Sequence, residues 1–234
     1  MSAAPRQVGE GIWCVTAGAY PSNCYIVATG SSDTAVLVDA GMEAPPVAAA
    51  LDGLGLRPTA IFCTHGHFDH IGGADELQRR FDVPVYLHAA DHKVARSSNM
   101  LLLMLGMPQR ITLPRFDLIE DGFTAAPGTR TLAYRHAPGH TPGSCTISIA
   151  DALFTGDTLY ARNMGPAPTP GEKPEQLRAS IRAMWEGLDK VTIHPGHGPS
   201  APGATVRSDN HAVRMYLGLD QPGDQSSPTY GDVR

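Results

Sequence analysis

The 234-residue sequence contains few cysteines and few aromatic residues, and each shortage narrows what the protein can be. Aromatic side chains make up 6% of the chain, so the core must be built mainly from aliphatic residues. No two cysteines are spaced as Cys-x-x-Cys, which argues against a thiolate zinc knuckle. All four lie in apolar, β-branched runs, which favours buried free thiols in a reducing compartment over disulfides. They are Cys14, Cys24, Cys63 and Cys145.

The sequence also lacks an excess of positive charge and a long apolar run. Lys and Arg number 18 against 23 Asp and Glu, a formal net charge of -5, whereas nucleic-acid-binding proteins normally carry a basic excess. The longest apolar run, residues 100–106, is far shorter than the roughly 20 residues of a membrane span. The first residues contain no apolar segment typical of a secretory signal. We therefore expect a cytoplasmic protein with a small-molecule substrate and with neither a nucleic-acid nor a membrane partner.

Glycine and proline are abundant, at 25 and 20 residues, and they separate short strand and helix patterns. β-Branched runs predict strands at residues 23–28, 34–39 and 59–64, and helical spacing predicts helices at 45–54, 174–188 and 203–219. No linker divides the chain, so we predict a single domain over residues 1–219, followed by a flexible tail at 220–234. Residues 96–107 are apolar on every face. They suit a core helix, the wall of an apolar substrate pocket or a homodimer contact.

The most informative stretch is Thr-His-Gly-His-Phe-Asp-His-Ile-Gly-Gly at residues 64–73, where three imidazoles and a carboxylate fall within six residues. Four such groups on one turn are costly to bury without a cation. Side chains alternate along extended backbone, so His65 and His67 can bind one ion, while Asp69 and His70 turn toward a second at the helix entry. Three later loops follow predicted strands and add Pro-Gly-His140, Thr-Gly-Asp157 and Pro-Gly-His197.

Together these motifs resemble the metallo-β-lactamase fold superfamily, and most closely the glyoxalase II-like metallohydrolases within it. The resemblance implies an α+β fold, a four-layer αββα sandwich with the site on loops at one edge. It also implies that Asp39 supports the site from outside the ligand set. The implied ligands are His65, His67 and His140 for a first metal, and Asp69, His70 and His197 for a second, with Asp157 and a water or hydroxide bridging both.

Nitrogen and oxygen ligands without thiolate suit zinc, so two zinc ions are expected, with iron or manganese also compatible. Two dications would lower the pKa of a shared water from 15.7 toward roughly 7 and so supply hydroxide for attack on a carbonyl. Asp69 and Asp157 are the predicted catalytic carboxylates, and Asp69 would orient the nucleophile and take its proton. A thiol with a pKa of about 8.5 leaves without an acid, which favours hydrolysis of a thioester or related ester.

Two other reactions remain open at this stage. A lactonase acting on an apolar acyl lactone would use the same hydroxide, and a mononuclear iron oxygenase like the persulfide dioxygenases retains many of the same motifs. Glutathione-using relatives tend to carry Arg-Thr-Asp where this chain has Pro-Ala-Pro at 166–168, which argues against glutathione substrates. Tyr160, Arg162 and Met104 are candidate substrate contacts. His194 is not expected to be a ligand.

Overall fold

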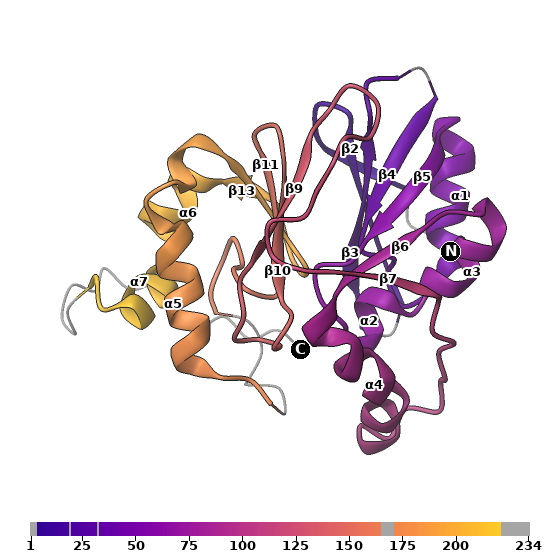
Figure 1. The fold of residues 1–234 in the computed structure, drawn as a ribbon. Coiled ribbons are helices and arrows are strands. Elements are labelled where there is room, and N and C mark those ends of the chain that lie inside the picture. Colours follow the sequence, from indigo (N-terminus) through magenta and orange to yellow (C-terminus); the bar gives the residue numbers. More distant parts are fainter. Residues whose placement is uncertain (1–3, 19, 32, 165–170, 221–234) are drawn as a thin grey trace.

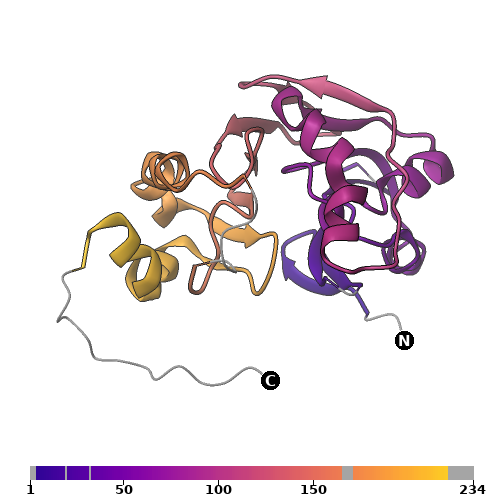
Figure 2. The ribbon, with the colours of Figure 1, turned by 90° about the horizontal axis from the view of Figure 1, so that it is seen from below.

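Two β-sheets stack face to face, with helices on both outer sides (Figures 1 and 2). The structure is a computed structural model that describes residues 4–18, 20–31, 33–164 and 171–220. The first sheet has the strand order β1-β2-β3-β4-β5-β6-β7, and the second has the order β13-β12-β11-β10-β9-β8. The predicted α+β fold, a four-layer αββα sandwich, is confirmed.

The elements follow one another along the chain with the N-terminal part of the sequence in the first sheet. The first sheet contains β1 (Arg6–Gly9), β2 (Ile12–Ala17), β3 (Ser22–Ala28), β4 (Thr34–Val38), β5 (Arg57–Phe62), β6 (Val85–His88) and β7 (Phe116–Ile119). The second contains β8 (Thr124–Ala125), β9 (Leu132–His136), β10 (Cys145–Ile149), β11 (Ala152–Gly156), β12 (Thr192–Pro195) and β13 (Ala201–Pro202). The helices are α1 (Ala44–Leu54), α2 (Phe68–Ile71), α3 (Ala74–Phe81), α4 (His92–Met104), α5 (Pro174–Trp185), α6 (Gly203–Asp209) and α7 (His211–Leu217), with 3-10 turns η1 (Ala89–Asp91) and η2 (Leu188–Lys190).

The alternation of side chains along β3 explains why the molecule has more than one core layer. Ile26 joins the cluster beneath helices α1 to α4, whereas its neighbours Tyr25 and Val27 face the other way, into the layer between the sheets. Tyr25 and Phe154 meet in that layer with ring centroids 5.1 Å apart. A third cluster lies between the second sheet and helices α5 to α7. Both faces of the central strands are therefore buried, which requires the continuous apolar runs seen in the sequence.

Parallel pairing places the loops that matter at a common edge. Strands β4, β5, β6 and β7 are parallel neighbours in the first sheet, and β11 and β12 are parallel in the second. Within each sheet the carboxyl ends of these parallel strands therefore lie side by side. The loops that follow β5 and β11 start there and can carry functional side chains. Helix α2 follows β5 at this edge, which lies at the bottom of Figure 1.

The helix predicted at 45–54 agrees with α1, whereas the helix predicted at 174–188 ends earlier, at Trp185, and Leu188 begins the separate turn η2. Helix α1 stops at Gly55, whose φ of 65° is the left-handed conformation that terminates many helices. The single helix predicted at 203–219 is wrong, because Asn210 divides it and caps α7 by accepting a hydrogen bond from the Val213 amide. No described helix is long and apolar enough to cross a membrane. The predicted tail, apart from residue 220, lies outside the described residues.

Candidate metal centre

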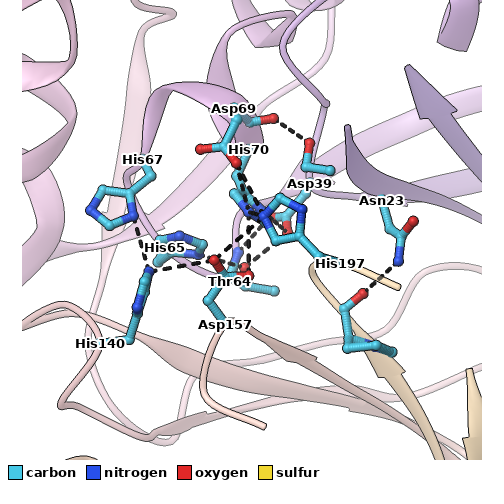
Figure 3. A network of polar contacts seen from close by, with 12 residues as sticks. Asn23, Asp39, Thr64, His65, His67, Asp69, His70, His140, Asp157 and His197 are labelled. Atoms are coloured by element: carbon cyan, nitrogen blue, oxygen red, sulfur yellow. Dashed lines mark hydrogen bonds and ion pairs between the residues drawn. The ribbon is translucent and has the colours of Figure 1, made fainter. Parts of the chain in front are cut away.

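The seven predicted ligand side chains converge at the edge between the two sheets (Figure 3). The turn between β5 and α2 carries His65 and His67, and the short helix α2 carries Asp69 and His70. The other three come from the second sheet: His140 follows β9, Asp157 follows β11 and His197 follows β12. Both halves of the chain are therefore needed to complete the cluster.

The first group consists of His65, His67 and His140, which are all buried. Nδ1 of His67 lies 3.0 Å from Nε2 of His140. Nε2 of His65 is buried and has no hydrogen-bond partner within the described part of the chain. An orphaned buried nitrogen beside two other imidazoles is costly in the protein alone, and a cation bound by all three would satisfy it. The donor set therefore fits a metal ion such as zinc.

The second group consists of Asp69, His70 and His197. Nε2 of His197 lies 3.2 Å from Oδ2 of Asp69 and 3.4 Å from Nε2 of His70. Asp157 lies between the groups: its Oδ1 is 3.4 Å from Nε2 of His70, and its Oδ2 is 3.5 Å from Nε2 of both His140 and His197. One carboxylate thus faces both groups, as a bridging ligand must.

Partners outside the ligand set hold the imidazoles in place. Asp39, buried and with a φ of 58°, accepts hydrogen bonds from the Thr64 amide at 2.7 Å and the Thr64 hydroxyl at 2.8 Å. Its Oδ2 also lies 2.8 Å from Nδ1 of His70, which leaves Nε2 of that ring directed at the cluster. The predicted supporting position of Asp39 agrees with this arrangement.

Two further hydrogen-bond partners of the ligand histidines cannot be recognised in the sequence. Nδ1 of His140 lies 3.3 Å from Oε2 of Glu172, and Nδ1 of His197 lies 3.0 Å from the carbonyl oxygen of Pro21. Glu172 stands 32 residues after its histidine, and Pro21 contributes only its main chain. Neither contact can be inferred from local spacing.

The two groups differ in electrostatics. Burial, together with neighbouring imidazoles, lowers the pKa of His65 well below its usual value and that of His67 to about 4. Burial also lowers the pKa of His70, but the carboxylates of Asp157, Asp69 and Asp39 outweigh it and raise the value to about 9. At His197 the carboxylates of Asp157 and Asp69 outweigh burial and raise the pKa to about 11. Without metal, His65 and His67 are therefore neutral at pH 7, whereas His70 and His197 hold protons that an ion must displace.

A cavity of about 670 Å³ opens from the ligands and extends between the helices of both halves. Its wall is mostly apolar, and no Lys or Arg side chain lines it among the described residues. Besides ligands, it is lined by Tyr20, Pro21, Phe68, Leu101, Leu105, Thr158, Leu159, Tyr160, Asn163, Met164, Glu172, Pro174, Leu177, Ile181, Val213 and Tyr216. The cavity is large enough for a drug-sized organic molecule.

The candidate substrate contacts are placed differently from one another. Tyr160 lines the cavity and is half-buried, with its ring 6.4 Å from that of His197. Arg162 is exposed and does not line the cavity. Met104 is 71% exposed and also lies outside the wall, to which α4 and the residue after it instead contribute Leu101 and Leu105. Contact of these residues with a substrate stays a prediction.

His194 packs in the core rather than facing the cluster. Its ring stacks on Phe154 with centroids 5.0 Å apart, and its Nδ1 lies 2.8 Å from the Ser200 hydroxyl. The residues Pro166 and Pro168, which argue against glutathione substrates, lie outside the described residues.

Comparison with known proteins agrees with this geometry. Residues 17–197 match the family model of the metallo-beta-lactamase superfamily. The chain is 32% identical to the probable metallo-hydrolase YqgX of Bacillus subtilis over 82% of this chain and 92% of the relative. It is 30% identical to the probable polyketide biosynthesis zinc-dependent hydrolase BaeB of Bacillus velezensis over 79% of this chain and 77% of that protein.

Solved structures give the same result. The chain superposes on TTHA1623 in its di-iron-bound form with a TM-score of 0.75 and 31% identity, covering 84% of this chain and 98% of that one. It superposes on the BLEG-1 B3 metallo-beta-lactamase with a TM-score of 0.77 and 28% identity, covering 86% and 99%. The chain belongs to the metallo-β-lactamase superfamily, as a metal-dependent hydrolase of that superfamily.

Proposed function

We propose that the protein hydrolyses a thioester or a related ester with an apolar acyl group, in the manner of the glyoxalase II-like enzymes, with two zinc ions in a cytoplasmic setting. The observation that carries the proposal is the apolar cavity that begins at the ligand cluster. An acyl chain can lie along Leu177 and Ile181 while its carbonyl carbon reaches the histidines. The absence of Lys and Arg from the described wall disfavours a strongly anionic substrate such as a glutathione conjugate.

Bound zinc would supply Lewis acidity and a coordinated water with a pKa of about 7. The chain's own residues supply the remaining functions. Asp69 lies 3.2 Å from His197 at the cavity wall, and we assign its carboxylate to orient the attacking water and accept its proton. Asp157 holds the two groups of imidazoles at a fixed separation through its two oxygens.

Tyr160 is the residue of the wall best suited to bind the carbonyl oxygen. Burial and the neighbouring Asp157 carboxylate raise the pKa of Tyr160 well above its usual value, so its hydroxyl stays protonated at neutral pH. A protonated phenol can donate a hydrogen bond to the oxygen on which negative charge develops. As the C–O bond forms and the C–S bond breaks, the leaving thiolate, with a pKa of about 8.5, needs no acid.

The proposal is tested with a panel of neutral thioesters whose acyl chains differ in length, with release of free thiol followed by a chromogenic disulfide. We expect hydrolysis to rise with acyl length until the cavity is filled, and a glutathione thioester to be a poor substrate. His67→Ala should abolish the activity. A protein that retains zinc but cleaves none of the thioesters would disprove this function.

An apolar acyl lactone is the second candidate, because a lactone carries no charge and fits the same wall. The panel should therefore include long-chain lactones, with ring opening followed by proton release, and a β-lactam. Metal content of freshly purified protein decides a third alternative. About two zinc ions per chain support hydrolysis, whereas about one iron with little zinc would point to a persulfide dioxygenase and to a test of oxygen consumption.

A further inference from the structure

Two buried polar side chains that bind no metal, Asp91 and Asn23, tie the ligand-bearing loops together. Asp91 is fully buried at the end of η1, directly before α4, and Asn23 is buried in β3. Each makes hydrogen bonds to main-chain groups beside a metal ligand, and the two residues act on different loops.

Asp91 joins the turn of His65 and His67 to the loop of His140. Its Oδ2 accepts hydrogen bonds from the Gly66 amide and the Thr141 hydroxyl, both at 2.7 Å. Its Oδ1 accepts a hydrogen bond from the Gly143 amide at 2.6 Å. Gly66 lies between His65 and His67, and Thr141 follows His140. One carboxylate therefore bonds to both segments that supply the first group of ligands.

The packing around Asp91 also explains two motif glycines. A Cβ atom at Gly66 would lie 2.9 Å from the carbonyl oxygen of Asp91, and one at Gly143 would lie 2.6 Å from its amide nitrogen. Both separations are too short for real atoms, so the two loops approach Asp91 closely only because they lack side chains there. The contact thus depends both on the Asp91 carboxylate and on the two glycines that lie against it.

Asn23 makes an equivalent connection to the loop of His197. Its side-chain amide donates hydrogen bonds to the carbonyl oxygens of Pro195 and Gly198, both at 2.9 Å. Its main-chain amide donates to the Gly196 carbonyl at 2.7 Å, and its Oδ1 accepts from Thr16 at 2.8 Å. These partners fix the orientation of the amide, because only the NH₂ end can face two carbonyl groups. The dashed line at Asn23 in Figure 3 shows one of these bonds.

We propose that Asp91 and Asn23 are positioning residues that set the two metal sites separately: Asp91 the site of His65, His67 and His140, and Asn23 the site that includes His197. The inference rests on metal binding at these loops and is independent of the substrate. Removing a partner outside the ligand set typically lowers metal affinity by about 10- to 100-fold. Substitution of Asp91 or of Asn23 is therefore expected to lower metal affinity at one of the two sites only.

Zinc affinity is measured by competition with a chromophoric chelator in two backgrounds. His197→Ala leaves the first site intact, and His140→Ala leaves the second. Asp91→Asn keeps the size of the side chain but turns an NH₂ group toward N–H or O–H donors. It should weaken zinc binding by about 10- to 100-fold in the His197→Ala background and not in the His140→Ala background. Asn23→Asp, which turns a carboxylate toward two carbonyls, should give the reverse result.

Ser98→Ala is the matched control, because Ser98 is a buried polar residue of the neighbouring helix α4 whose one hydrogen bond given by the structure goes to the Gly66 carbonyl and not to the His140 loop. It should leave both affinities unchanged. Circular dichroism of the metal-free proteins checks folding. If Asp91→Asn or Asn23→Asp does not fold, Thr141→Val and Thr16→Val each remove one of the same bonds, and smaller losses with the same site preference are expected.

Equal losses at both sites, or unchanged affinities in folded variants, would overturn the proposal and leave the two residues with a packing role only. A failure of the thioester panel would not affect these affinities. The two proposals can therefore fail separately.

Discussion

The substitution Gly196→Ala is the most direct way to perturb the metal centre without replacing a ligand. Gly196 lies between Pro195 and the ligand His197, and its φ is not in the left-handed region, so alanine can adopt the same backbone. A Cβ atom there would lie 2.1 Å from Oδ1 of Asp157 and 2.6 Å from Cε1 of His70. Gly196→Ala therefore strains two ligands without changing any of them.

The size of the effect follows from these separations. Real Cβ atoms essentially never approach another atom within 3.0 Å, so the carboxylate of Asp157 would have to retreat by about 0.9 Å. A displacement of about 1 Å in a catalytic group can cost about 100-fold in rate, or about 2.7 kcal/mol in activation free energy. Because Asp157 faces both groups, retention of both metals should fall as well.

The assay is metal content by elemental mass spectrometry after dialysis, together with hydrolysis of the best thioester. Gly53→Ala is the control, because Gly53 is an exposed residue of α1 at which a Cβ atom would meet nothing within 4 Å beyond its own helix backbone. That control should keep its metal and its activity. If Gly196→Ala also kept two metals and a rate within about threefold of the parent, the close approach of this loop to Asp157 would be refuted.

Three other outcomes are expected. His67→Ala should lose the metal of the first site and nearly all hydrolysis, measured by metal content and thiol release, and unchanged hydrolysis would contradict the ligand assignment. Leu105→Ser, at the apolar wall, should raise KM for long acyl chains more than for short ones, whereas an equal effect on both would argue against an acyl-binding wall. In metal-free protein, His70 and His197 hold protons that the unfolded chain releases near pH 6.5, so thermal stability should fall as pH rises from 6.5 through 9, and a flat profile would oppose the raised pKa values.

The ligands could be predicted from the sequence because four of them lie close together along the chain. His65, His67, Asp69 and His70 lie within six residues, where the backbone alone restricts their relative positions. The later ligands each follow a strand that ends at the same edge, so strand prediction brought them near the cluster. The sequence and the family resemblance therefore named as candidate ligands the seven residues whose side chains the structure brings together.

The residues of the cavity wall were harder to predict from the sequence, because the sequence does not show which face of α4 lines the cavity. Residues 100–105 are apolar without interruption, so their pattern does not say which face meets the core. In the structure Leu102 is fully buried, Leu101 and Leu105 line the cavity one turn apart, and Met104 is exposed. Only the packing of α4 against the rest of the molecule selects among these faces.

The contacts of Glu172, Asp91 and Asn23 could not be predicted from the sequence, because each joins groups that are far apart along the chain. Asn23 meets the Pro195 carbonyl 172 residues away, and Asp91 meets the Gly143 amide 52 residues away. A buried carboxylate or amide in a sequence gives no indication of which loop will satisfy it. These positions follow from tertiary structure alone.

Charge distinguishes the two metal sites more than ligand number does. In the first group His65 and His67 are neutral at pH 7, so an ion there displaces no proton from these two imidazoles. The negative charge beside this group comes from Asp157 and, behind His140, from Glu172. The second group offers Asp69 and, behind His70, Asp39, yet its imidazoles hold protons in the absence of metal. Competition between proton and metal therefore acts mainly on the second site. Raising the pH from 7 to 9 should strengthen that site relative to the first, which makes pH the natural variable for filling the two sites in order.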